Sequence, residues 1–334
     1  MIPLIILGGM GLVGVGKSLI AIAEQSEATD INSSARNLIQ SAQNKVKSQR
    51  KATEAVLEDY GMRKLRAFNG AIANFIDSFG QLKNVELTDS PELDKLQLGD
   101  FSAKSLEGLK NDYQLLMDSG LGLGVGLGSG AALAFGAYNG TMLLATASTG
   151  TAISTLSGVA ATNATLAWLG GGTLAAGGGG MAMGTMVLGG IVTGPALLIF
   201  GHIVGSKAET ALANAQANKE VAQTHSQDAE KATKALVAIQ NVTELANDTF
   251  SKITTHLRRS VRELDEVIKT HGVDFSGFAP ESRATVFKSV KFAQLIKTMI
   301  DTPILDENGA LVLSTKKRVQ DINLVLEKNE INQS

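Results

Sequence analysis

The sequence predicts an all-α protein, an elongated bundle of long amphipathic helices around a Gly-rich hydrophobic helical hairpin. Two observations predict it. No Gly or Pro occurs between Lys17 and Tyr60 or from Lys207 to His271, so each stretch can form one uninterrupted helix. Between them, residues 119–206 contain no Asp, Glu, Lys or Arg and hold 23 of the 36 glycines. Two polar helical arms therefore flank a long uncharged centre.

Composition divides the chain into five segments. They are an apolar N-terminal helix at 1–23, a helical arm at 24–118, the uncharged Gly-rich centre at 119–206, a long coiled-coil-like helix at 207–272 and a small C-terminal helical element at 273–334. The centre is the segment suited to act on a membrane, because it is apolar over a length that exceeds the roughly 20 residues of a span.

The N-terminal segment contains GLVGVGKS at 11–18, which satisfies the phosphate-loop pattern through Gly11, Gly16, Lys17 and Ser18. A phosphate loop also needs a parallel sheet, and after Ser18 the sequence is helical with no β–α alternation. The stretch Ile2–Ala23 is apolar apart from Lys17, whose amine can reach an interface. We therefore interpret it as an apolar helix. It lacks the basic start of a cleavable signal peptide.

The first arm continues with a second helical stretch, Met62–Leu82, which we expect Gly61 and Gly70 to interrupt. Asn84–Phe101 has turn chemistry, and Ser102–Met117 resumes helical spacing. The apolar face of the second stretch consists of Leu65, Phe68, Ile72, Phe75, Ile76 and Phe79.

The second arm has apolar positions that alternate in steps of three and four, the pattern of a helix packed along other long helices. After Gly272, Pro280 can begin a helix that ends near Ile300. Residues 306–309 (DENG) predict the turn of a small β-hairpin, and a final helix is expected at Lys316–Lys328. The apolar positions of the long helix are Ala222, His225, Ala229, Ala232, Leu236, Ile239, Thr243, Ala246, Phe250, Ile253, Leu257, Val261, Leu264 and Ile268.

Two stretches of the centre, Gly120–Ala147 and Met181–Gly205, are long enough to cross a bilayer. A third stretch, Thr151–Gly172, is weakened by polar residues. Trp168 is suited to a lipid–water interface. A strong turn signal precedes the last apolar stretch and consists of Gly177, Gly178, Gly179 and Gly180.

The start of the centre, GLGLGVGLGSG, contains two glycine series with four-residue spacing. The first series is Gly120, Gly124 and Gly128; the second is Gly122, Gly126 and Gly130. On a helix the two series line nearly opposite faces, so neighbouring helices could approach closely on both sides. The same alternation also fits a strand with all glycines on one face, and the pattern alone leaves both structures open.

Several classes of protein are disfavoured by composition. Without cysteine there is no disulfide or thiolate nucleophile, and the four histidines are scattered, so we expect no metal and no cofactor. Net charge is −2, with 13 basic and 15 acidic residues in 1–118 and 17 of each in 207–334. No basic stripe exists for nucleic acid. We expect a protein that is not an enzyme.

The chain shows two resemblances to known families. The run ATNATLAWLGGGTLAAGGGGMAMGTMVLGGIVTGPAL at 161–197 resembles a signature of an uncharacterised bacterial family, and it implies no particular activity. The overall layout resembles the α-helical pore-forming toxins of the haemolysin E type, which implies a lipid-engaging hydrophobic tongue. This centre is far longer than such a tongue, and Ile2–Ala23 lacks the polar face of a pore-lining helix.

The leading hypothesis is a bacterial membrane-associated protein that self-associates and inserts its centre into a bilayer, forming a pore or permeabilising it in toxin or defence biology. It permits a soluble form before insertion. Its partners are the lipid bilayer and further copies of the chain. The alternative is a permanent membrane-anchored coiled-coil scaffold that recruits a partner protein through its long helices. A phosphate-loop NTPase is the third hypothesis.

Overall fold

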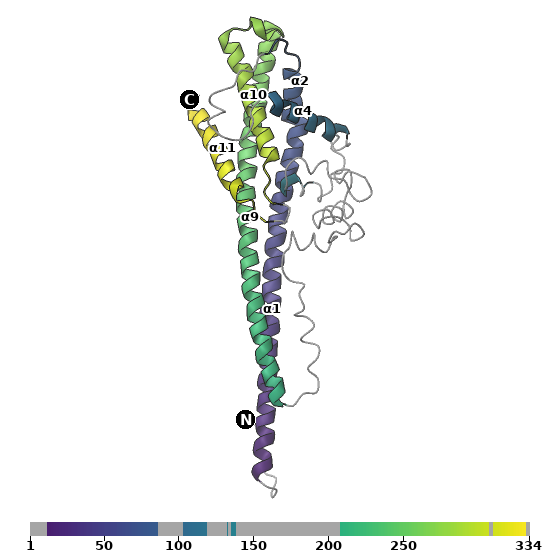
Figure 1. Ribbon diagram of the computed structural model, residues 1–334, viewed down its shortest axis with the longest axis vertical. Helices are drawn as coiled ribbons and strands as arrows, with labels where there is room; N and C mark the ends of the chain where they lie inside the picture. The colour runs from purple at the N-terminus through teal and green to yellow at the C-terminus, as the bar shows by residue number, and fades with distance from the viewer. Residues whose placement is uncertain are drawn as a thin grey trace, which may run out of the picture. The chain divides into compact units, whose positions relative to one another are not determined.

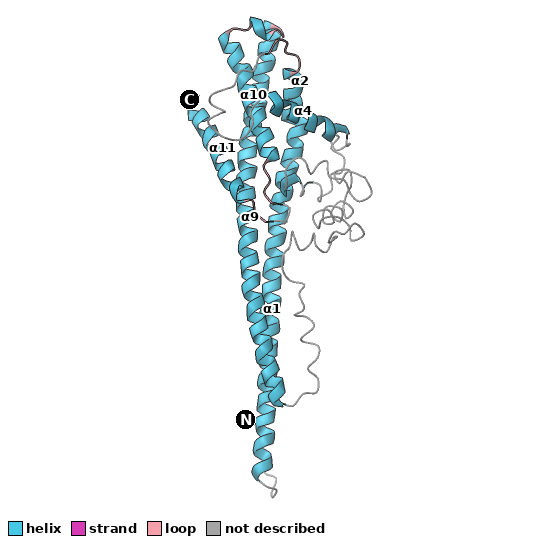
Figure 2. Ribbon diagram, viewed as in Figure 1, coloured by secondary structure: helices cyan, strands magenta, loops and turns pink. Residues whose placement is uncertain are grey.

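The structure, a computed structural model, describes residues 12–85, 103–118, 132, 135–137, 208–306 and 310–331. Long helices form a bundle, and the described residues contain no strand (Figure 1, Figure 2). The all-α prediction is therefore confirmed. The elements are α1 (Leu12–Ala67), the π-helical turn η1 (Phe68–Ile72), α2 (Ala73–Phe79), α4 (Ala103–Asp118), α9 (Ala208–His271), the 3-10 turn η6 (Phe275–Gly277), α10 (Pro280–Asp301) and α11 (Leu313–Ile331).

The chain forms two compact units, and α1 and α9 contribute to both. The first unit contains residues 1–49 and 191–234, and the second contains 50–190 and 235–334. In the first unit, α1 and α9 pack through small side chains. Ala28 lies in one buried cluster with Ala211, and Asn218 Nδ2 donates to Asn32 Oδ1 at 2.9 Å. Because both partners advance together along the chain, the two helices run parallel.

The second unit contains the main hydrophobic core, to which α1, α2, α4, α9, α10 and α11 all contribute. Here too α1 and α9 run parallel: Thr53 Oγ1 donates to the carbonyl of Leu236, and Asn247 Nδ2 donates to Asp59 Oδ2. Parallel helices cannot be joined by a short loop, so the residues between α1 and α9 form a long crossover connection. The Gly-rich centre belongs to this connection.

The apolar positions expected on α9 lie on its packed side. From Ile239 to Leu264 every one of them is buried, and α9 is a single helix of 64 residues. The apolar face expected after Gly61 also lies in the core, with Leu65, Phe68 and Phe75 at 2% exposure or less. Pro280 is the first residue of α10, as predicted, because proline is tolerated in a first helical turn.

Two expectations about local structure are wrong. Gly61 does not interrupt the helix, since α1 continues to Ala67 and the helical geometry changes only at η1, which contains Gly70. The β-hairpin is replaced by an isolated antiparallel bridge between Leu305 and Leu311. A strand after this bridge has no room to extend, because α11 begins at Leu313.

Among the described helices, none combines the length and the apolar composition of a membrane span. The predicted spans fall almost wholly outside the described residues. The same holds for both glycine series from Gly120 to Gly130, for Trp168 and for Gly177–Gly180.

Candidate functional site

The structure describes four residues of the Gly-rich centre, Ala132, Phe135, Gly136 and Ala137, and all four are helical and buried. Ala132 and Ala137 are 0% exposed and Phe135 is 4% exposed. We call these four residues the docked segment. It lies in the second unit, against α1 and the residues that follow α10.

The docked segment and α1 meet backbone to backbone at Gly61. A Cβ atom on Gly61 would lie 1.7 Å from the carbonyl oxygen of Ala132, and a Cβ on Gly136 would lie 1.8 Å from the carbonyl oxygen of Leu57. Real Cβ atoms do not approach so closely, so both positions require glycine while the backbones keep this spacing. This is the small-residue packing that lets two helices approach closely. It also explains why Gly61 occurs inside a continuous helix.

The docked segment continues the first glycine series. Ala132 and Gly136 follow Gly128 at intervals of four residues in the sequence, and these two described helical residues share one face. The two described members of this face are the ones that contact α1. The helix packing proposed from the sequence for residues 120–130 concerns residues outside those that the structure describes, and it stays a prediction.

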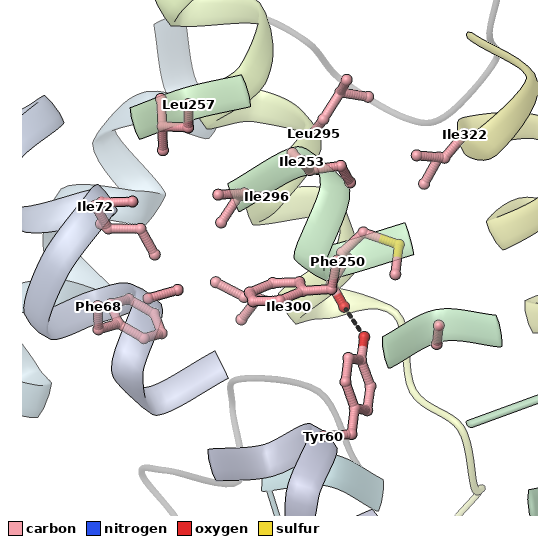
Figure 3. Close-up of a cluster of buried hydrophobic side chains, with 14 of the residues drawn as sticks. Tyr60, Phe68, Ile72, Phe250, Ile253, Leu257, Leu295, Ile296, Ile300 and Ile322 are labelled. Atoms are coloured by element: carbon pink, nitrogen blue, oxygen red, sulfur yellow. Dashed lines mark hydrogen bonds between the residues drawn. The ribbon is translucent and has the colours of Figure 1, made fainter. Parts of the chain in front are cut away.

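Aromatic packing fixes the docked segment against the core. The Phe135 ring meets the Phe68 ring edge-on, with centroids 6.4 Å apart. Phe68 is fully buried in the cluster that also contains Phe250 and Ile300 (Figure 3). Releasing the docked segment would thus expose apolar surface of both the segment and the bundle.

Two carbonyl oxygens of the docked segment accept hydrogen bonds from the bundle. Lys64 Nζ donates to the carbonyl of Phe135 at 3.0 Å. The backbone N–H groups of Ile304 and Leu305 both donate to the carbonyl of Ala137, each at 2.9 Å. A buried carbonyl without a hydrogen-bond partner destabilises a protein. These three bonds therefore offset the cost of burying the two carbonyl groups of the segment.

Lys64 is an unusual donor, because its side chain is 0% exposed. Its amine lies 4.3 Å from the centre of the Tyr60 ring, in a cation–π arrangement. Among the described side chains, no carboxylate forms an ion pair with it. Burial lowers the pKa of Lys64 to about 7, although the charge of Asp301 acts in the opposite direction.

Tyr60 completes this environment. Its hydroxyl donates to the backbone carbonyl of Met299 on α10 at 3.4 Å (Figure 3). Its ring packs edge-on against Phe250 of α9, with centroids 6.0 Å apart. Complete burial raises the pKa of Tyr60 far above its ordinary value, so the hydroxyl stays protonated.

An ion-pair group binds α4, the helix that ends one residue before the Gly-rich centre. Lys297 Nζ lies 2.8 Å from Asp112 Oδ2 of α4 and 2.7 Å from Asp301 Oδ2. Burial lowers the pKa of Lys297, but its hydrogen bonds to both carboxylates outweigh burial and raise it. Burial raises the pKa of Asp112 despite its bond to Lys297. The two attachments, Asp112 and the docked segment, lie on either side of Gly120–Gly130 in the sequence.

The other predicted site residues fall elsewhere. Leu12–Ser18 are helical residues of α1, which is not the backbone of a phosphate loop, and Gly11 lies outside the described residues. No cluster of metal-binding side chains occurs in the part of the chain that the structure describes. Lys64 was missed from the sequence. The sequence feature that points to Lys64 is its spacing of four residues from both Tyr60 and Phe68, which places all three on one helical face.

Comparison of the chain with protein-family models, with curated proteins and with solved structures gave no match.

Proposed function

We propose that the chain is a non-enzymatic, membrane-active bacterial protein that self-associates and inserts its Gly-rich centre, residues 119–206, into a bilayer and permeabilises it. The observation that carries this proposal is the burial of the docked segment in the helical core. A long charge-free segment exposes apolar surface to water unless the protein covers it. The bundle covers the docked segment with close backbone packing, an aromatic contact and three hydrogen bonds.

This arrangement favours conditional insertion. Each contact of the docked segment is non-covalent, so it can be broken and replaced by contacts with lipid or with another copy of the chain. In a bilayer, the small-residue face that packs on α1 would become available to helices of other copies. We therefore expect self-association to accompany release of the docked segment from the bundle.

Dye release from liposomes tests the proposal. The purified full chain should release an encapsulated dye from liposomes that contain anionic lipid, with a rate that rises more steeply than linearly with protein concentration, because copies must associate. Absence of both release and lipid association over a range of pH and lipid composition would contradict the proposal.

Fractionation separates this proposal from the permanently anchored scaffold, which the parallel pairing of α1 and α9 also suits. Expressed protein is extracted with and without detergent. The proposed function predicts a water-soluble fraction whose helical content matches that of the detergent extract. Recovery only in detergent would favour the scaffold.

A further inference from the structure

We propose that Lys64 couples the docking of the Gly-rich centre to pH, because uptake of a proton by its buried amine weakens the hold of α1 on Phe135 and Gly136. This inference rests on the proposed function and names its regulation. Lys64 joins three features of the site. It donates to the docked segment, packs on Tyr60 and belongs to the helix that carries Gly61.

The geometry gives the amine few ways to stabilise a positive charge. Its side chain is excluded from water, and its described polar partners are one carbonyl oxygen and one aromatic face. A neutral amine can donate the same hydrogen bond to Phe135, so docking does not need the charge. A charged amine in this place loses its hydration, and one carbonyl and one ring replace it only in part.

Two titratable groups act on the amine: the Tyr60 ring of α1 contacts it, and the charge of Asp301 on α10 acts on it. Asp301 in turn pairs with Lys297 of α10, which also pairs with Asp112 of α4. The Asp301 carboxylate already binds Lys297, so it lowers the cost of a charge on Lys64 without neutralising it. On the side of α9, the Tyr60 ring packs against Phe250, whose side chain carries no charge.

The direction of the pH effect follows from linkage. In the docked state the pKa of Lys64 is about 7, and in water the pKa returns to its ordinary value of 10.5. Undocking therefore takes up a proton between these values, and the docked state gains stability as pH rises through this window. Between pH 6 and pH 8 the ratio of docked to undocked molecules should rise about tenfold. Asp112 acts oppositely and at lower pH: burial raises its pKa above the ordinary value, so its protonation favours the packing of α4.

Hydrogen exchange of the full chain in lipid-free buffer tests the inference. The peptides to follow are those that contain residues 132–137 and the N–H groups of Ile304 and Leu305. Rates are divided by the intrinsic rate at each pH, so that the resulting protection factors report the opening equilibrium. Protection in the wild type should fall about tenfold from pH 8 to pH 6.

Three variants make the result specific. Lys64→Met keeps the size of the side chain but cannot take up a proton, so its protection should not change between pH 6 and pH 8. Lys64→Arg is charged at both pH values, so its protection should be low and equally flat. Lys51→Met, at an exposed position of α1, should behave as the wild type. The inference would be overturned if the protection factors of the wild type did not fall from pH 8 to pH 6, or if those of Lys64→Met fell by the same amount.

Dye release distinguishes failure of the inference from failure of the proposed function. Liposome leakage at a rate independent of pH, with pH-independent protection, would leave the function standing and overturn the role of Lys64. A tenfold fall in protection that disappears in Lys64→Met, without leakage at any pH, would support the pH-sensitive docking and contradict the membrane function.

Discussion

Gly61 of α1 and Gly136 of the Gly-rich centre face each other with no side chain between them. A Cβ atom on Gly61 would lie 2.7 Å from the nitrogen of Gly136, and one on Gly136 would lie 3.1 Å from the nitrogen of Gly61. The two glycines let a helix of the bundle and an apolar segment approach as closely as helices do in membranes. The bundle therefore packs this segment through the close backbone approach that paired glycines permit.

Adding one methyl group at this crossing should displace the docked segment. Gly61→Ala and Gly136→Ala should each destabilise the second unit by about 1–3 kcal/mol, because the added atom meets backbone that cannot rotate away. Gly70→Ala is the matched control, since its nearest contact would be the Arg258 guanidinium at 3.9 Å. Urea unfolding followed by circular dichroism gives the comparison. Equal stability of Gly61→Ala and Gly70→Ala would show that the crossing is not tight.

In the ion-pair group that binds α4, removal of Lys297 and removal of Asp112 should change the stability of the protein by very different amounts. Lys297→Met leaves Asp112 and Asp301 without their shared cation. We therefore expect the free energy of unfolding to fall by about 1–3 kcal/mol, less than for a fully buried pair because these side chains are partly exposed to water. Asp112→Asn removes a carboxylate whose pKa is raised by burial, and it leaves the pair of Lys297 with Asp301 intact. Its effect should stay below about 1 kcal/mol. Urea unfolding at pH 7 measures both, and a larger loss in Asp112→Asn would contradict this order.

Small side chains should also be required where α1 and α9 pack in the first unit. Ala215 is 0% exposed, so Ala215→Leu should push the two helices apart at a cost of about 1–3 kcal/mol. Ala217→Leu is the control, because Ala217 is exposed on the same helix. Hydrogen exchange of peptides covering 26–39 and 211–222 should increase in the first variant alone. Unchanged exchange would indicate that the pair has room for larger residues.

The sequence is informative where periodicity and burial coincide. The apolar positions of α9 and the start of α10 at Pro280 could be predicted, because a helix must bury one face and proline begins helices readily. Gly61 was misjudged because local propensity counts glycine as a break, whereas tertiary packing uses its missing side chain. The spacing of Tyr60, Lys64 and Phe68 places Lys64 on the packed face of α1, but its hydrogen bond to Phe135 could not be predicted, because it depends on which residues of a distant segment cover Lys64. The predicted hairpin failed because an isolated pair of strands needs more length than the chain between α10 and α11 provides.

The second glycine series can be tested even though it lies outside the described residues. If it forms a contact face between helices in the bilayer, replacing Gly122, Gly126 and Gly130 together by Leu should weaken oligomers and leakage while membrane partitioning persists. The corresponding Ala variants should be milder, since Ala is small and favours a helix over Gly by roughly 1 kcal/mol. Crosslinking in liposomes measures oligomers. Undiminished crosslinking in the triple Leu variant would contradict the packing face, and Ala variants that gain no helicity would favour the strand.

Entry of the Gly-rich centre into a membrane should remove it from the bundle. Hydrogen exchange of the full chain with and without anionic liposomes at pH 6 tests this release most directly. We predict that peptides from 119–206 become protected by lipid while the N–H groups of Ile304 and Leu305, which bind the Ala137 carbonyl in the docked state, lose protection. If liposomes leave the exchange of both regions unchanged, or if Ile304 and Leu305 remain protected while the centre is bound to lipid, the proposed release is wrong.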